Sequence, residues 1–222
     1  MISSRSHGRW VIRTVDSTAS TNDDIRALAR SGAPDGTVVV ARRQEHGRGQ
    51  WNRVWVSPEG GLYFTVLLRP ETPARDWPAL SPAVAAAVRS ALVGYFGMDP
   101  DAVRVKCPND IICDAGKLCG TVLEAFDATC VAVGIGVNVF HPAQPVRTDG
   151  RNVPAYAVDL ASHDALMRLM GAASVLTMEI ILSPFTMLPN PILIKCAIII
   201  LDHSMFCTCS RIFSISVFSS IA

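Results

Sequence analysis

The segment GRGQWNR, residues 47–53, carries side chains suited to binding an anion. Its two glycines, Gly47 and Gly49, allow left-handed backbone and let a ligand approach the main chain closely. Arg48 and Arg53 offer forked donors that match a carboxylate or a phosphate. The same composition is typical of a surface loop that binds nothing, so the segment alone predicts an anion site but no reaction.

Two further segments place a lysine beside a turn. In VKCPNDI (105–111), Lys106 stands at the end of a predicted strand, and the Pro-Asn-Asp that follows favours an extended entry into a turn. In GKLCG (116–120), Lys117 occupies a predicted hairpin corner beside two glycines. Each segment also has a plain structural explanation: a turn with a solvated lysine in the first, and a tight hairpin in the second.

A fourth segment, GIGVNV (134–139), has two glycines inside a predicted strand. Glycine weakens a strand unless something must approach the backbone closely, or unless the strand bends or bulges there. The segment therefore predicts either a ligand lying on the strand or a local bend.

Two helices are expected to help position these segments. STASTNDDIRALARSG (17–32) predicts a helix capped by Ser20 or Thr21 and stopped by its final glycine. SPAVAAAVRSALVGYFG (81–97) predicts a core helix with Ser81 as its cap and proline at its first position.

Strands are predicted over residues 37–42, 62–68, 103–106, 111–113, 118–126 and 129–140. The polar segment 43–61 between the first two strands is too long for a hairpin turn, and such loops often carry function. The order of elements favours an α+β fold with a mixed or antiparallel sheet packed against helices, rather than alternating βαβ units.

Taken together, the segments resemble the catalytic domain of biotin–protein ligases, of the monofunctional type without a DNA-binding domain. The resemblance runs from about Val15 to Val139. It is carried by STN (20–22), QEHGRGQWNR (44–53), KCPND (106–110), GKLCG (116–120) and GIGVN (134–138). It implies a class II synthetase-like fold and two reactions. Biotin and MgATP give biotinyl-5′-adenylate, and the biotinyl group then passes to a lysine of a biotin carboxyl carrier domain.

The resemblance also assigns roles to matching positions. Ser20, Thr21 and Gln44 would hydrogen-bond the ureido ring of biotin, and Arg48 with its flanking glycines would wrap the biotin carboxylate. Lys117 would contact the acyl-phosphate end. The residues implied in the chemistry are Arg48, Lys106, Lys117, Arg53 and Asp110. Those implied in biotin and adenylate binding are Ser20, Thr21, Asn22, Gln44, Gly47, Arg48, Gly49, Gln50, Lys117, Gly120, Gly134, Gly136 and Asn138.

Within this assignment, Lys106, Asp110 and Arg53 match positions around the nucleotide, metal and phosphates, and no metal ligands are fixed. Leu118 and Trp51 are expected in the apolar part of the biotin pocket. No covalent protein nucleophile is required, which fits the absence of a recognisable Ser/His/Asp or Cys/His arrangement.

Three positions depart from the usual family pattern. Cys107 stands where a tryptophan normally packs beside the site, and its loss would cost about 3–5 kcal/mol if the neighbours do not compensate. Asn52 replaces a glycine, which is a mild change because asparagine tolerates left-handed backbone. Gln50 replaces a cation, so we expect weaker retention of the anionic adenylate.

Composition divides the chain. Residues 171–222 hold four of the 39 Asp, Glu, Lys and Arg residues. We expect a catalytic domain over 1–165 and an atypical apolar tail over 166–222, produced by a frame change or a misjoined segment. The 14 residues before Val15 leave no room for a helix-turn-helix.

Charge and targeting signals limit the kinds of partner and the compartment that we expect. The balance of 20 basic and 19 acidic residues gives no basic surface for nucleic acid or anionic membranes. The longest uncharged run in the tail, 180–194, has 15 residues and contains prolines, whereas a spanning helix needs about 20. With no export signal and seven cysteines, we expect a cytoplasmic protein with reduced thiols, acting as a monomer or homodimer.

Two alternatives remain open at this point. A lipoate or octanoate ligase or transferase would share the fold, although such enzymes typically lack the GRGQWNR and KCPND combination. An inactive biotin-binding remnant, disabled by Cys107 and the tail, is the other alternative.

Overall fold

The computed structural model describes residues 3–7, 10–146 and 153–161, so the predicted tail lies outside the described residues. Its strands are β1 (Ser3–His7), β2 (Trp10–Thr18), β3 (Thr37–Gln44), β4 (Gly61–Leu68), β5 (Arg104–Lys106), β6 (Asp110–Cys113), β7 (Gly116–Ala125) and β8 (Val131–Asn138). Its α-helices are α1 (Thr21–Arg30) and α2 (Leu80–Phe96). Short 3-10 turns cover Gln50–Asn52, Ala74–Ala79 and Ala157–Asp159.

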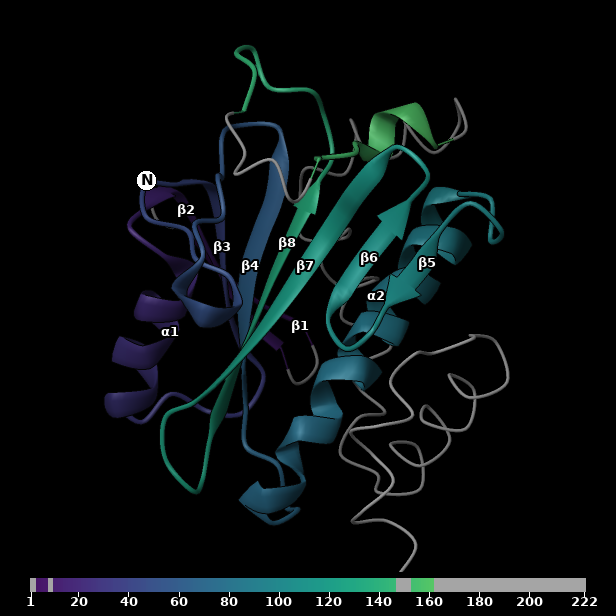
Figure 1. The fold of residues 1–222 in the computed structure, drawn as a ribbon. Helices are drawn as coiled ribbons and strands as arrows, with labels where there is room; N and C mark the ends of the chain where they lie inside the picture. Colours follow the sequence, from purple (N-terminus) through teal and green to yellow (C-terminus); the bar gives the residue numbers. More distant parts are fainter. Residues whose placement is uncertain (1–2, 8–9, 147–152, 162–222) are drawn as a thin grey trace, which may run out of the picture.

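The strands form one sheet in the order β1-β2-β3-β4-β8-β7-β6-β5 (Figure 1). β2 and β3 run parallel and every other neighbouring pair is antiparallel. The predicted α+β fold with a mixed sheet and flanking helices is therefore confirmed. β1 and β2 were not predicted, although β2 contributes Trp10 and Ile12 to the core.

The two helices cover opposite faces of the sheet. Val38 packs with the core under α2, whereas the next residue, Val39, packs with Ile25 of α1. Successive strand residues point to opposite faces, so these two clusters lie on the two sides of the sheet. The α1 face carries the candidate site.

The ends of the helices follow the predictions in part. α1 begins after Ser20, whose backbone is extended, and Gly32 beyond its end has φ 83°. α2 ends at the left-handed Gly97 as predicted. The prediction that Ser81 caps α2 is wrong, because a preceding 3-10 turn leads the helix in at Leu80. The Ser81 hydroxyl instead donates to the carbonyl of Pro108, in the β5–β6 turn.

Candidate functional site

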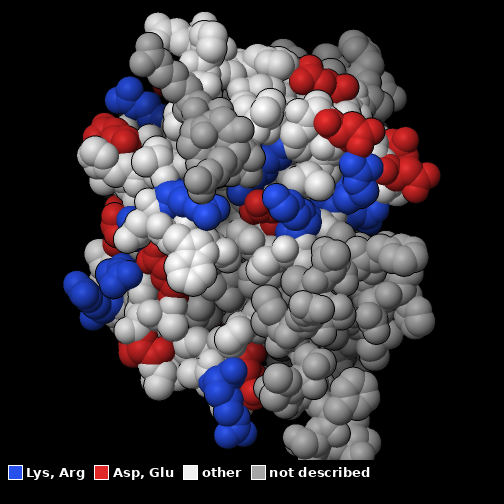
Figure 2. All heavy atoms as spheres, viewed as in Figure 1, with Lys and Arg blue, Asp and Glu red and all other residues white. Residues whose placement is uncertain are grey.

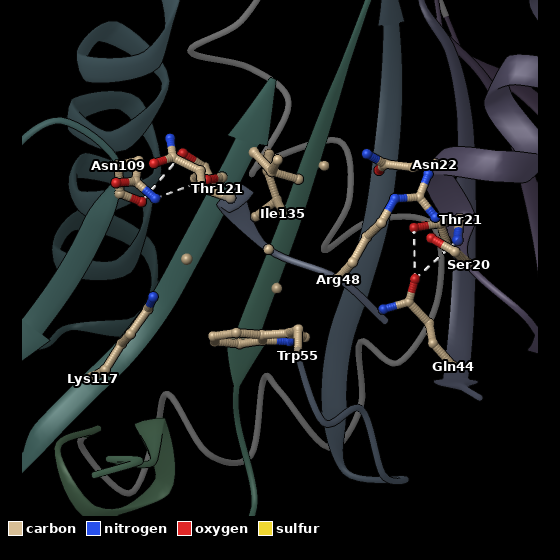
Figure 3. A pocket seen from close by; sticks show the side chains of 16 residues that line it. Ser20, Thr21, Asn22, Gln44, Arg48, Trp55, Asn109, Lys117, Thr121 and Ile135 are labelled. Carbon is tan, nitrogen blue, oxygen red and sulfur yellow. Dashed lines mark hydrogen bonds between the residues drawn. The ribbon is translucent and has the colours of Figure 1, made fainter. Parts of the chain in front are cut away.

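A cavity of about 50 Å³ opens on the α1 face between the start of α1, the loop after β3, and strands β7 and β8 (Figure 3). Its lining residues are Ser20, Thr21, Asn22, Gln44, Arg48, Gly49, Gln50, Trp55, Asn109, Lys117, Gly120, Thr121, Val122, Gly134, Ile135 and Gly136. Most of the residues implied in ligand binding therefore converge here, from four separate segments of the chain.

The polar end of the cavity lies at the first turn of α1. Thr21 donates its backbone N–H to Gln44 Oε1 at 2.9 Å, and its hydroxyl lies 3.0 Å from the same oxygen. Gln44 Nε2 in turn donates to Ser57 Oγ at 2.9 Å, which fixes the orientation of the amide. The Ser20 side chain makes no capping bond although Ser20 is the N-cap. It is buried and lines the cavity, so its hydroxyl can serve a ligand.

A buried hydroxyl of β4, Thr65, ties this end together. Thr65 Oγ1 lies 2.7 Å from Thr21 Oγ1 and 2.6 Å from Asn22 Oδ1. A hydroxyl has one proton, so if Thr65 donates to Asn22, the proton between the two threonines must come from Thr21. Gln44 Oε1 then keeps only the N–H of Thr21, which leaves it free to accept a ligand donor.

Two buried donors lack partners among the described residues: Asn22 Nδ2 and Trp55 Nε1. Both side chains line the cavity. Burying a polar group without a hydrogen bond costs about 1–3 kcal/mol, so a ligand acceptor at this position would recover that free energy.

Gly134 and Gly136 of β8 lie at the floor of the cavity. A Cβ on Gly136 would lie 2.5 Å from Trp55 Nε1, and one on Gly134 would lie 2.4 Å from Asn22 Oδ1. In the structure the Trp55 indole packs against Gly136 and the Asn22 amide packs against Gly134. Protein side chains, and not a ligand, therefore make the close approach to this strand.

A β-bulge aims Lys117 at the cavity. Ile111 pairs with Cys119, whereas the next residue, Ile112, pairs with Lys117, so Leu118 is the extra residue on β7. The bulge turns Leu118 into the core beneath α2 and leaves Lys117 on the face of Gly120. Lys117 Nζ contacts Asp110 Oδ1 at 2.7 Å and lies 5.2 Å from the centre of a Trp55 ring.

Arg48 joins the loop to both neighbouring elements. Its guanidinium bonds Asp23 of α1 through two nitrogens, at 2.7 and 2.9 Å. It also bonds Glu124 of β7, at 3.0 and 3.3 Å. The hydrogen bonds from Arg48 lower the pKa of Asp23. Burial raises the pKa of Glu124, but the hydrogen bonds that Glu124 accepts outweigh it, so this pKa also lies below its ordinary value.

A second cavity of about 360 Å³ adjoins the first, sharing Gly49, Gln50, Trp55, Asn109 and Lys117 with it. Its other lining residues are Trp51, Arg53, Val54, Val56, Asp110, Asn138, Val146 and Pro154. The loop that forms its rim has left-handed backbone at Trp51 and Asn52, with φ 59° and 55°. The positive φ predicted for Gly47 and Gly49 is absent, and Asn52 adopts the left-handed conformation that glycine would.

The predicted residues that do not line the first cavity fall into three groups. Gly47 lies behind the first cavity, where a Cβ would meet the Trp55 carbonyl at 2.4 Å. Arg53, Asp110 and Asn138 line only the second cavity. Lys106 is exposed and lines neither cavity, so its role stays a prediction.

The predicted apolar wall is wrong in both members. Leu118 is in the core and Trp51 is 87% exposed on the rim, whereas Trp55 lies on the glycine floor. Sequence patterns did not single out Trp55, Thr65 or Glu124. Trp55 is four residues from Trp51 in the same loop, and only the fold shows which indole faces inward.

Cations and anions alternate around the site, so this face is not a uniformly positive patch (Figure 2). Within the described ranges, no group of three or more His, Cys, Asp and Glu side chains could hold a metal ion. Among the described residues, Cys107, Cys113, Cys119 and Cys130 form no disulfide, and the expected reduced state stays a prediction. Among the described helices, none has the length and apolar character needed to cross a membrane.

Comparisons with known proteins agree with this geometry. Residues 11–138 match the model of the biotin/lipoate A/B protein ligase family. The bifunctional ligase/repressor BirA of Bacillus spizizenii is 38% identical over 129 residues, covering 56% of this chain and 39% of that protein. The biotin–[acetyl-CoA-carboxylase] ligase of Mycobacterium tuberculosis is 33% identical over 142 residues, covering 63% of this chain and 53% of that protein.

A crystal structure of the biotin protein ligase from Leishmania major in complex with biotinyl-5-AMP superposes with a TM-score of 0.65 and 25% identity. The match covers 87% of this chain and 81% of that one. This chain thus spans about half, or less, of the length of the two curated relatives described above.

Proposed function

Because this chain belongs to the biotin/lipoate A/B protein ligase family, we propose that it makes biotinyl-5′-AMP from biotin and ATP and transfers biotin to a carrier lysine. One observation carries the proposal. The first cavity has a cluster of amide and hydroxyl groups at one end and Lys117 at the other. Lys117 also lines the second cavity.

Biotin fits the first cavity by chemistry. Its ureido group has one carbonyl acceptor and two N–H donors. The unpartnered Asn22 Nδ2 and the Ser20 hydroxyl suit the carbonyl, and Gln44 Oε1 suits an N–H. Ligand pockets are typically about 300 Å³ or larger, and this cavity is about 50 Å³, so biotin binding requires the cavity to widen.

The second cavity is proposed for the nucleotide, since its volume of about 360 Å³ and its apolar rim suit a base and ribose. Lys117 lies between the two cavities, where the biotin carboxylate and the α-phosphate would meet. Asp110 is the carboxylate that fits the Mg²⁺ of MgATP, because that ion is commonly held by one or two carboxylates plus phosphates. The ion would supply charge neutralisation at the phosphates.

In the first reaction, a biotin carboxylate oxygen bonds to the α-phosphorus and the bond to pyrophosphate breaks. Lys117 would hold the two anions together and stabilise the charge that builds on the α-phosphate. In the second reaction, a neutral lysine amine of the carrier attacks the acyl carbon, AMP leaves, and the amine loses a proton.

The acceptor would be a biotin carboxyl carrier domain, since relatives include a biotin–[acetyl-CoA-carboxylase] ligase. We place the protein in the cytoplasm, in keeping with the absence of a disulfide among the four described cysteines. Whether it acts as a monomer or a homodimer stays a prediction.

Binding competition separates the proposal from the lipoate alternative. Labelled biotin is bound to the full chain by equilibrium dialysis, and unlabelled biotin or lipoate is added. The proposal expects displacement by biotin and none by an equal concentration of lipoate. Displacement by lipoate alone, or no biotin binding at all, would overturn it. Thr21→Val, which removes one hydroxyl from the ureido end, is expected to weaken biotin binding by about 5- to 100-fold.

A further inference from the structure

Arg48 is almost fully occupied by protein carboxylates. A guanidinium has five N–H donors. In Arg48, Nε donates to Glu124 Oε1, Nη1 donates to Asp23 Oδ2, and Nη2 donates to both residues, at 2.7 to 3.3 Å. Four of the five donors are therefore engaged, in two paired contacts that each match the fork of the side chain.

The charge of Arg48 is already neutralised by protein carboxylates. Arg48 alone faces two carboxylates, those of Asp23 and Glu124. Arg26 also binds Glu124, at 3.1 Å, so the cluster of two arginines and two carboxylates is neutral without a ligand. A biotin carboxylate could gain a paired contact with the Arg48 guanidinium only by displacing at least one of these pairs, and it would then leave a half-buried carboxylate uncompensated.

The contacts connect three elements that meet at the cavity. Asp23 stands one residue after Asn22 on α1, and Glu124 stands two residues after Val122 on β7. Arg48 is flanked by the two glycines of the loop, and Gly47 O accepts the Trp55 N–H at 2.9 Å. The ion pairs therefore fix the part of the loop that carries both the cavity backbone and Trp55.

We propose that Asp23 and Glu124 are positioning residues that hold Arg48, and through it loop 44–57, against α1 and β7. The substrate carboxylate is then met by loop backbone and Lys117, and not by the Arg48 guanidinium. The identity of the substrate rests on the proposed function, whereas the anchoring of the loop does not.

Proteolysis tests the anchoring without any ligand. Trypsin cleavage after the exposed Arg53 is followed in the full chain and in Glu124→Gln, Asp23→Asn and Arg48→Gln variants. When opening is fast, cleavage tracks the population of the open loop. Glu124 is 19% exposed and Asp23 is 51% exposed, so we expect about tenfold faster cleavage in Glu124→Gln and about two- to fivefold in Asp23→Asn.

The matched control is Asp24→Asn, one residue along in the same helical turn, which should cleave at the parental rate. Combining Asp23→Asn with Arg48→Gln should add nothing to Arg48→Gln alone, since both remove the same contact. Parental cleavage in Glu124→Gln and Arg48→Gln would overturn the proposal.

Ligand binding then distinguishes positioning from direct contact. Arg48→Gln and Arg48→Lys should both weaken biotin and its neutral alcohol analogue biotinol by the same factor, because lysine lacks the fork that grips two carboxylates. If Arg48 binds the carboxylate directly, only biotin should lose affinity, and lysine should restore it; that result would also overturn the proposal. Failure of the parental chain to bind either compound would refute the proposed function, and the proteolysis result would still decide the anchoring.

Discussion

Replacing Gly136 with alanine tests whether biotin binding depends on the packing of the Trp55 indole against Gly136. The added Cβ would lie 2.5 Å from Trp55 Nε1, 2.7 Å from Cε2 and 3.1 Å from Cζ2. The strand cannot yield, because Gly136 is paired on both sides, with Tyr63 of β4 and with Gly120 of β7. The indole therefore has to move, and the space it moves into is the candidate biotin cavity.

The magnitude follows from the cost of overpacking. Inserting a methyl group into a packed site costs about 1–3 kcal/mol, which corresponds to about a 5- to 150-fold change in an equilibrium constant. Part of this cost appears as lost stability and part as lost biotin affinity. We expect the affinity loss to be at least about fivefold, because the cavity holds only about 50 Å³ before the indole is displaced.

Isothermal calorimetry with biotin and urea unfolding measure the two parts separately. Gly94→Ala is the matched control, since a Cβ there meets nothing within 4 Å. It should stabilise α2 by about 0.5–1 kcal/mol and leave biotin affinity unchanged. A Gly136→Ala protein that binds biotin within about twofold of the parent would refute the reasoning, because biotin binding would then not depend on the packing of Trp55 against Gly136.

Three further predictions follow from the same region. Thr65→Val removes the buried hydroxyl bonded to Asn22 and should lower the free energy of unfolding by about 1–3 kcal/mol in urea titrations; an unchanged value would contradict the network. Gln50→Arg should slow the escape of biotinyl-adenylate into solution, measured by trapping the released compound, and an unchanged rate would sink the idea. Asp23 and Glu124 have folded-state pKa values below their ordinary 3.8 and 4.5. The stability that these two carboxylates contribute is therefore fully present above their ordinary pKa values. It is lost as the pH falls from there through the lower pKa values of the folded state. Urea unfolding across this range should show a smaller acid loss in Glu124→Gln than in the parent.

Local patterns were sufficient for most of the fold. Glycine at 32 and at 97 ends each helix in left-handed backbone, and apolar runs between turn residues marked β3, β4, β7 and β8. β2 was missed because it mixes polar and apolar residues, with a parallel neighbour that comes 19 residues later in sequence. Only tertiary pairing reveals such a strand.

The site was predictable where a residue acts through its type and position in a motif. Thr21, Gln44 and Lys117 belong to short segments that are recognisable as a set, in their order and spacing, and they lie in one cavity. Trp55, Thr65 and Glu124 could not be found in this way, because each matters through a partner distant in sequence. The bulge at Leu118 is a further example, since one extra residue decides that Lys117 and not Leu118 faces the cavity.

Biotin-dependent release of pyrophosphate from MgATP measures whether this chain activates biotin, as we propose. We expect pyrophosphate and biotinyl-5′-AMP in equal amounts when the full chain is given biotin, and neither product with lipoate. Lys117→Met should abolish release while biotin still binds. A chain that binds biotin but releases no pyrophosphate would contradict the claim and identify a binding remnant.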